Sequence, residues 1–134
     1  MTQAADKLAI AELCHIFEIA FDDGDIDAHM DTWVEDLSFS SAFGDHDTRE
    51  GYIGWVKGFY EQTQQAGGTR HLISNSVATI RGDRATHTAY LTVLNRKDGS
   101  VMGTARFDDE LVRTDDGWRF AARALSVDEN LKGE

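Results

Sequence analysis

The chain has 134 residues, 41% of them hydrophobic, and a formal net charge of −11 at pH 7. This length predicts a single domain over residues 1–134, and the hydrophobic content excludes a disordered chain. The negative charge argues against nucleic acid or an anionic membrane as a partner, because both would repel the protein. A single cysteine, Cys14, excludes an internal disulfide. With no leader-like segment and no apolar run of bilayer length, we expect a cytoplasmic protein.

The beginning of the chain predicts two helices. Apolar residues recur at helical spacing over residues 4–22, which predicts an amphipathic helix. Gly24 lies where a residue in the left-handed conformation would end this helix. Asp25 is then placed to cap a second helix over residues 26–35.

A short strand and a third helix follow. The alternation of apolar and polar residues in LSFSSAF predicts a half-buried strand over residues 37–43. Asp47, with Glu50 three residues later, resembles a capping box that opens a third helix. Gly67 and Gly68 end that region.

The second half of the chain predicts an antiparallel meander. Gly-Asp or Asp-Gly pairs, which signal hairpins, separate four strand-forming stretches: 70–80, 85–96, 101–113 and 118–127. The order ααβαββββ indicates an α+β fold in which a strongly curved antiparallel sheet packs on the N-terminal helices. We expect an apolar cavity between the concave face of the sheet and the helices, a common place for a small-molecule site.

The strand TRHLISNSVATI supplies candidate residues for this cavity. Period-two alternation puts one set of its side chains on the cavity face: His71, Ile73, Asn75 and Val77. Pairing across the turn at Gly82 and Asp83 adds Tyr90 to this face and turns His87 away from it, although a one-residue slip would reverse that assignment. An imidazole in an apolar cavity favours its neutral, basic form.

The segment FDDGDID offers four aspartates as partners for that histidine. A general base must be held in one tautomer, and a carboxylate on its far nitrogen does this. Asp25 and Asp27 lie at the N-terminus of the second helix, where negative charge is stabilising, and Asp23 lies away from the apolar face of the first helix. Asp22 lies in the last turn of the first helix, where the dipole disfavours negative charge and favours a cationic neighbour. We therefore predict an Asp22–His71 dyad with His71 as the general base.

Ordinary structural roles compete with these interpretations. A single histidine on a strand is more often a hydrogen-bonded core residue than a catalyst, and an aspartate at a helix end is more often solvated. Aromatic residues such as Phe17 and Trp33 fill cores more often than they contact ligands. The histidines are scattered without paired ligand spacing, so we predict no metal site: His15, His29, His46, His71 and His87.

Three stretches of the chain carry a family resemblance: FDDGDIDAHMDTWVEDLSF, TRHLISNSVATIRGDRATHTAYL and RFDDELVRTDDGWRFAARAL. They resemble the SnoaL-like group of the nuclear transport factor 2-like superfamily, and the resemblance covers nearly the whole chain. Relatives include scytalone dehydratase, hexachlorocyclohexane dehydrochlorinase and polyketide cyclases. Ketosteroid isomerase and the small subunits of ring-hydroxylating dioxygenases are more distant. The resemblance implies a cone-like, cystatin-like α+β barrel.

The resemblance also implies roles for single residues. The family's aspartate before x-Gly-Asp matches Asp22, and the catalytic histidine of the dehydratase type matches His71. A basic residue five positions after the Trp of the last strand, important in the dehydrochlorinase, matches Arg123. Two features depart from the pattern. Phe17 stands where the dehydrochlorinase has a lysine, and the second catalytic histidine of scytalone dehydratase has no clear equivalent.

Together, the residues and the resemblance predict a cofactor-independent lyase or isomerase acting on a small hydrophobic cyclic substrate. The remaining predicted contacts are with that substrate: Phe17, Trp33, Asn75, Tyr90 and Arg123. The reaction subtype stays open between dehydratase, dehydrohalogenase, ketosteroid-isomerase and polyketide-cyclase types. Two alternatives also stay open, a non-catalytic binding or assembly module and the small subunit of a dioxygenase. We expect no cofactor, nucleic acid or membrane partner, and a homodimer or homotrimer.

Overall fold

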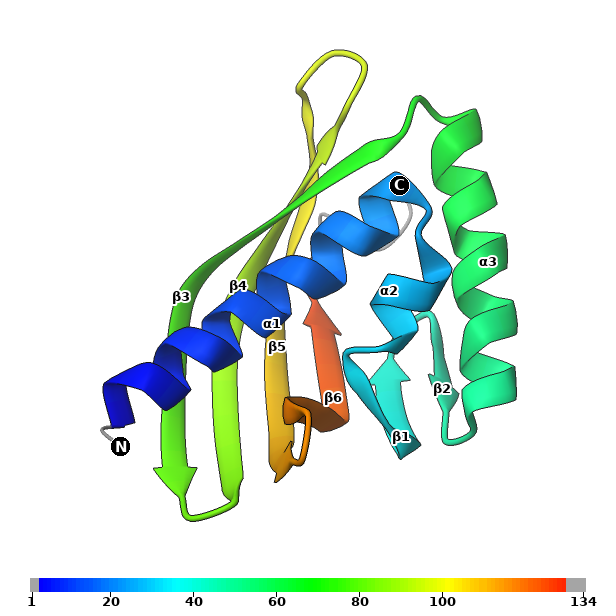
Figure 1. Ribbon diagram of the computed structural model, residues 1–134. Coiled ribbons are helices and arrows are strands. Elements are labelled where there is room, and N and C mark those ends of the chain that lie inside the picture. The colour runs from blue at the N-terminus through cyan, green and yellow to red at the C-terminus, as the bar shows by residue number, and fades with distance from the viewer. Residues whose placement is uncertain (1–2, 130–134) are drawn as a thin grey trace.

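The computed structural model describes residues 3–129, which fold into helices packed on one curved sheet (Figure 1). The elements follow the chain in this order: α1 (Gln3–Asp23), α2 (Ile26–Met30), β1 (Trp33–Ser41), β2 (Gly44–His46), α3 (Arg49–Gln65), β3 (Thr69–Arg81), β4 (Arg84–Asn95), β5 (Val101–Thr114) and β6 (Gly117–Val127). No helix in residues 3–129 is both long and apolar enough to cross a membrane.

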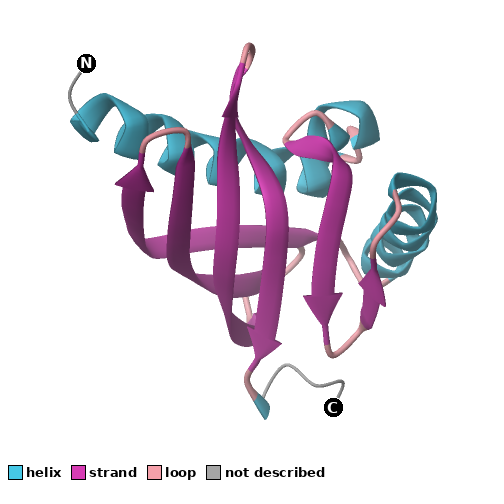
Figure 2. Cartoon of the chain, turned by 90° about the horizontal axis from the view of Figure 1, so that it is seen from below, coloured by secondary structure: helices cyan, strands magenta, loops and turns pink. Residues whose placement is uncertain are grey.

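The sheet has the strand order β2-β1-β6-β5-β4-β3. Figure 2 shows its strong curvature, with α1 lying along one side. The α+β class and the curved sheet are confirmed. The structure adds two details. The pair β1–β6 is parallel, whereas the other strand pairs are antiparallel, and the sheet is open, with β2 and β3 at its edges.

The predicted helix ends are correct where local capping decides them. Gly24 adopts a φ of 72° after α1, and the Asp25 side chain accepts a hydrogen bond from the Ala28 backbone N–H at 3.1 Å. The third helix has a different cap from the one predicted. Thr48, not Asp47, is its N-cap and accepts a hydrogen bond from the Gly51 N–H at 3.1 Å.

Long-range pairing decides the elements that were predicted incorrectly. The second helix ends at Met30 instead of residue 35, because Trp33 already pairs with Phe120 of β6. The strand predicted over residues 37–43 therefore begins earlier and ends at Ser41, and the short β2 was not predicted. Partners distant in the chain override local propensity here. The four strands of the meander lie within two residues of their predicted ends.

A β-bulge in β3 changes which side chains face the helices. Ser74 pairs with Tyr90 but Val77 pairs with Thr88, so two residues of β3 oppose one of β4. Within this bulge Asn75 has a φ of 57°. Beyond it the alternation is reversed, so Val77 is 66% exposed on the outer face.

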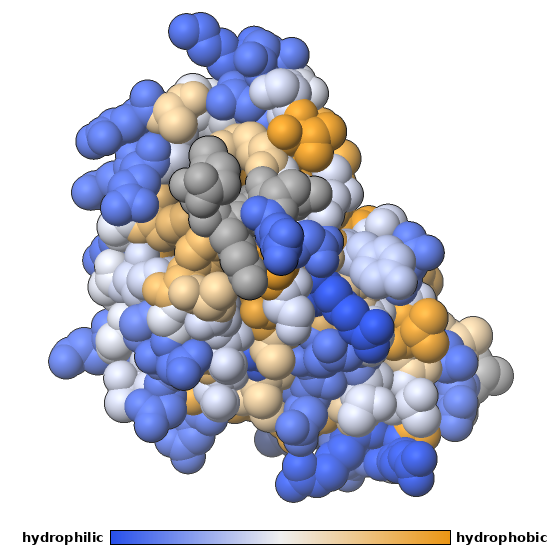
Figure 3. All heavy atoms as spheres, turned by 180° about the vertical axis from the view of Figure 1, so that it is seen from behind, coloured by the Kyte–Doolittle hydropathy of each residue, from blue (hydrophilic) through white to orange (hydrophobic). Residues whose placement is uncertain are grey.

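The bulge reverses the predicted orientation of two β4 side chains. Tyr90, predicted to face the cavity, is 48% exposed on the outer face, whereas His87, predicted to point outward, is buried on the inner face. The outer face, seen from behind in Figure 3, mixes hydrophilic and hydrophobic residues. The main core therefore lies between the inner face and the helices, where aromatic side chains from α1, β1, α3, β5 and β6 pack together.

Candidate active site

The last turn of α1 meets the first residues of β3 through one carboxylate. The Asp22 Oδ1 atom lies 2.7 Å from the His71 Nδ1 atom and accepts a hydrogen bond from the Thr69 hydroxyl at 2.9 Å. Its Oδ2 atom accepts the His71 backbone N–H at 2.8 Å. Both Asp22 and the His71 ring are more than nine-tenths buried. The structure thus brings together the two residues of the predicted dyad, while their catalytic role stays a prediction.

This contact fixes the tautomer of the ring. A carboxylate accepts hydrogen bonds, so the Nδ1 atom of His71 must carry the proton. Its Nε2 atom has no hydrogen-bond partner within residues 3–129, and the ring lines a cavity. Burial opposes the charged form of His71. The Asp22 hydrogen bond and the surrounding negative charge outweigh burial, so the pKa of His71 is raised above 6.5.

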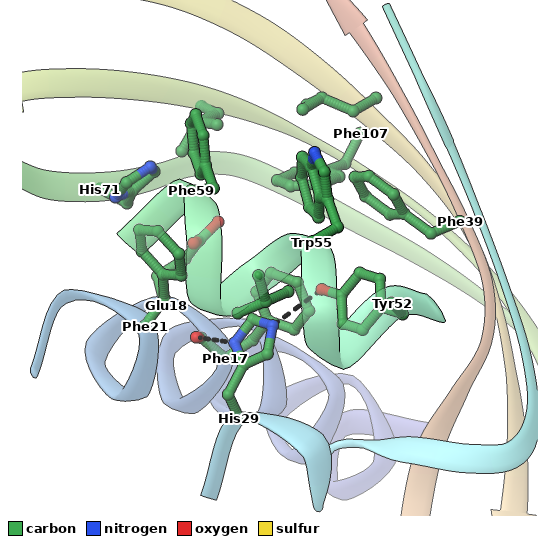
Figure 4. Close-up of a pocket in the computed structure, with 13 residues that line it drawn as sticks. Phe17, Glu18, Phe21, His29, Phe39, Tyr52, Trp55, Phe59, His71 and Phe107 are labelled. Carbon is green, nitrogen blue, oxygen red and sulfur yellow. Dashed lines mark hydrogen bonds between the residues drawn. The ribbon is translucent and has the colours of Figure 1, made fainter. Parts of the chain in front are cut away.

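The cavity lies between α1, α3 and the concave face of the sheet (Figure 4). Its walls are mainly aromatic and include Phe17, Phe21, Phe39, Trp55, Phe59 and Phe107. Its volume is about 50 Å³, which is smaller than the ~150 Å³ that holds a benzene ring in an engineered protein cavity. Trp55 and Phe59 are stacked, with ring centroids 5.4 Å apart, and both are only half-buried. A ring-sized ligand therefore requires these α3 side chains to move.

A fixed polar pair lies across the cavity from His71. The His29 Nδ1–H donates to the Phe17 carbonyl at 2.9 Å, so its Nε2 atom accepts from the Tyr52 hydroxyl at 2.7 Å (Figure 4). Burial lowers the pKa of His29 to about 4 and raises that of Tyr52. Both groups are therefore neutral at pH 7, and they offer a ligand polarity without charge.

The cavity also contains a carboxyl group that has no hydrogen-bond partner among the described residues 3–129. Glu18 is 3% exposed and lies one helical turn before Asp22. Its Oε2 atom is buried without a hydrogen bond from any residue in the described range 3–129. Burial and the nearby negative charges raise the pKa of Glu18. Figure 4 shows this carboxyl group on the same side of the pocket as His71.

Four of the five predicted substrate contacts lie outside the cavity lining. Phe17 lines it, but Trp33 is buried in the core against Phe120 instead. Asn75 is exposed within the β3 bulge, and the bulge shifts the register so that Tyr90 pairs with the exposed Ser74 and lies on the outer face. Arg123 does not reach the cavity either, because it is held in a buried ion pair.

That ion pair belongs to a second polar cluster under α1. The two carboxylate oxygens of Asp109 accept hydrogen bonds from Arg123 at 2.8 and 3.1 Å. One of them also lies 2.7 Å from the Nδ1 atom of His87, whose Nε2 atom lies 2.6 Å from the Ser76 hydroxyl. The Arg123 guanidinium packs over three aromatic rings, the nearest centroid being that of Phe107 at 3.7 Å.

In the same cluster Cys14, His87 and Asp109 place potential metal-ligand atoms within 4.8 Å of one another. The donors do not fit a cation. Burial raises the pKa of Cys14 to about 12, so its sulfur remains a neutral thiol. Asp109 already neutralises the guanidinium of Arg123. The cluster is therefore a structural hydrogen-bond network of the core.

Three polar residues of the cavity were missed from the sequence. The sequence does contain a signal that could have placed Glu18 in the cavity, because Glu18 lies four residues before Asp22 and shares a helix face with it. No such signal exists for His29 and Tyr52, because the hydrogen bond between them depends on how α2 and α3 pack.

Comparison with known proteins identifies the family. Residues 2–124 match the SnoaL-like domain. The chain belongs to the SnoaL-like family. A cystatin-like protein of unknown function from Nostoc punctiforme shares 32% sequence identity, with a TM-score of 0.86 and 96% of each chain covered. Comparison with curated proteins gave no match.

Two further solved structures share the fold of this SnoaL-like protein, and both are from Novosphingobium aromaticivorans. A nuclear transport factor 2-like protein is 24% identical, with a TM-score of 0.83, 98% of this chain covered and 86% of the other. A proposed scytalone dehydratase is 18% identical, with a TM-score of 0.79, 94% of this chain covered and 86% of the other. At these identities the likeness shows the fold alone.

The hydrogen bond from Thr69 to Asp22 yields a stability prediction. Thr69→Val keeps the shape of a buried side chain but removes a donor to a carboxylate, so it should cost about 2 kcal/mol of unfolding free energy. Thr79→Val, at an exposed position of the same strand, should cost less than about 0.5 kcal/mol. Urea denaturation measures both. Equal stability of the two variants would show that Asp22 does not depend on this bond.

Proposed function

We propose that this SnoaL-like protein is a cofactor-independent lyase or isomerase. In this proposal His71, oriented by Asp22, removes a proton from a small hydrophobic cyclic substrate. The observation that carries the proposal is the buried 2.7 Å contact between the Asp22 and His71 side chains, beside an aromatic cavity that the ring lines. Oriented in this way, the imidazole has one nitrogen bound to the carboxylate and the other free to accept a proton.

The chemistry follows from the ordinary behaviour of such a pair. When the Nε2 atom accepts a proton, the ring becomes a cation, and the Asp22 carboxylate stabilises that charge. General-base catalysis of this kind supplies about 10²–10⁴ in rate. Positioning the substrate against the aromatic walls must supply the rest.

The substrate class follows from the walls of the cavity. Aromatic side chains on three sides favour a planar or cyclic apolar molecule, and the neutral His29–Tyr52 pair favours an uncharged polar group at one end. The substrate enters, in this proposal, by displacing the half-buried rings of Trp55 and Phe59.

The assembly and location are part of the same proposal. The outer sheet face carries exposed apolar side chains, among them Leu72, Val77 and Tyr90. They support a homodimer or homotrimer formed through that face, as the family resemblance implies. The single buried cysteine suits a reducing compartment, which supports a cytoplasmic location.

Deuterium exchange into simple ring ketones tests the proposed base. Cyclohexanone and 1-indanone carry a weakly acidic proton beside a carbonyl, so NMR in heavy water follows proton removal without knowledge of the natural substrate. The wild-type protein should accelerate the exchange. His71→Ala and Asp22→Asn should each lower the protein-dependent rate by at least about 100-fold.

Matched variants on α1 serve as controls. His15→Ala and Asp23→Asn alter exposed residues of the same types and should retain the wild-type rate. Binding of the ketones with no exchange in the wild-type protein would favour the non-catalytic binding module. Full exchange by His71→Ala would contradict the proposed mechanism.

The raised pKa of His71 sets the pH dependence of that exchange. Only the neutral ring accepts a proton, so kcat/KM should fall as the pH is lowered through a pKa above 6.5. Asp22→Asn removes the hydrogen-bonding carboxylate, so in this variant the acid limb should move to lower pH while the rate falls. A wild-type limb below pH 6.5, or the same limb in both proteins, would argue against His71 as the base.

A further inference from the structure

The Glu18 carboxyl group is a buried polar group of the cavity that the described residues leave unpaired. It lines the cavity together with His71, and no residue in 3–129 donates or accepts a hydrogen bond at this carboxyl group. Buried polar groups are nearly always paired, and each exception calls for an explanation. Glu18 is 3% exposed, so bulk solvent does not satisfy its buried Oε2 atom.

The charges around Glu18 decide its protonation state. Burial opposes the carboxylate, and so do the charges of Asp22 on α1 and Asp109 on β5. His71 on β3 and Arg123 on β6 favour the carboxylate, but Arg123 is already paired with Asp109 through both carboxylate oxygens. The net result is a raised pKa of Glu18, which favours the neutral acid.

We infer that Glu18 is the acid of this site and donates its O–H to a carbonyl oxygen of the substrate while His71 takes the neighbouring proton. The inference rests on the proposed function and adds the substrate class, a carbonyl compound with an acidic C–H bond beside the carbonyl. Glu18 and Asp22 lie one turn apart on α1, and His71 is bound to Asp22. The acid and the base therefore face one cavity from adjoining positions.

The step balances without any further reactant. The Nε2 atom of His71 takes the proton, and the electrons of the broken C–H bond form a carbon–carbon double bond. The carbonyl π electrons move to the oxygen, which takes the Glu18 proton and becomes an enol. The site then holds an imidazolium and a second carboxylate, whose charges attract each other. Returning the protons to other atoms completes an isomerisation. In an elimination the enol O–H returns its proton to Glu18 as the carbonyl re-forms, and the enol electrons form a double bond to the next carbon as its leaving group departs with its own bonding electrons and takes the His71 proton.

Substitution of Glu18 separates this role from that of the base. Glu18→Gln keeps the shape and a hydrogen-bond donor but carries no transferable proton, so deuterium exchange into cyclohexanone should fall roughly tenfold. Glu18→Met also removes the donor and should lower the rate further. Glu12→Gln, at an exposed position of α1, should exchange like the wild type. Full exchange by Glu18→Gln, with His71→Ala inactive, overturns the role of Glu18 and leaves the proposed base intact.

Infrared spectroscopy tests the protonation state without catalysis. At pH 7 the difference spectrum between the wild type and Glu18→Gln should contain the C=O stretch of a protonated carboxylic acid. Addition of carbonyl-labelled cyclohexanone should shift this band and lower the ketone stretch, and both changes should vanish in Glu18→Met. An ionised Glu18 at pH 7, or a ketone stretch equal in the wild type and Glu18→Met, overturns the inference even where no turnover is observed.

Thermal unfolding supplies a third, independent readout. The pKa of Glu18 is raised in the folded state above the ordinary 4.5. Protonation of Glu18 therefore contributes its full stability below pH 4.5, and this contribution is lost as the pH rises through the folded-state pKa. The melting temperature of Glu18→Gln should therefore match or exceed that of the wild type, by a margin that grows between pH 5 and 8. A variant that loses stability at every pH would assign Glu18 a structural role instead.

Discussion

The site and the fold both depend on the hydrogen bonds that the Asp22 carboxylate accepts. The carboxylate joins the end of α1 to the start of β3 through the Thr69 hydroxyl and through two donors of His71. One bond to the His71 backbone sets the position of the strand, and one to the ring sets its tautomer. Packing and chemistry are therefore fixed by a single side chain, and a shift of α1 along the sheet would disturb both.

Two carboxyl groups one helical turn apart on α1 differ in the hydrogen bonds that they accept. Asp22 receives three hydrogen bonds, whereas Glu18 receives none within residues 3–129. Hydrogen bonds favour the charged form of a carboxyl group, and burial without them favours the neutral form. An acid and an oriented base can thus coexist in one apolar cavity. An unpaired buried carboxyl group lowers the stability of the folded protein. Such a destabilising group is expected where it serves function.

The sequence predicted the parts of this arrangement that local rules control. Helix capping at Gly24 and Asp25 and the turns of the meander follow from short-range chemistry. The Asp22–His71 contact was inferred because only Asp22 lacked a local role. The orientation of Tyr90 was predicted wrongly because the bulge at Asn75 leaves no hydrophobic signature and reverses every side chain beyond it. The other cavity residues depend on packing between distant helices, which no spacing rule encodes.

The central claim is that the Asp22 carboxylate holds a buried imidazole with its Nε2 atom free to accept a proton. The ¹⁵N NMR shifts of the His71 ring, measured at a pH above its pKa, test this most directly. The structure predicts a protonated Nδ1 atom that exchanges slowly with solvent, and an Nε2 atom without a proton. A ring protonated at Nε2, or one whose two nitrogens average rapidly, would contradict it.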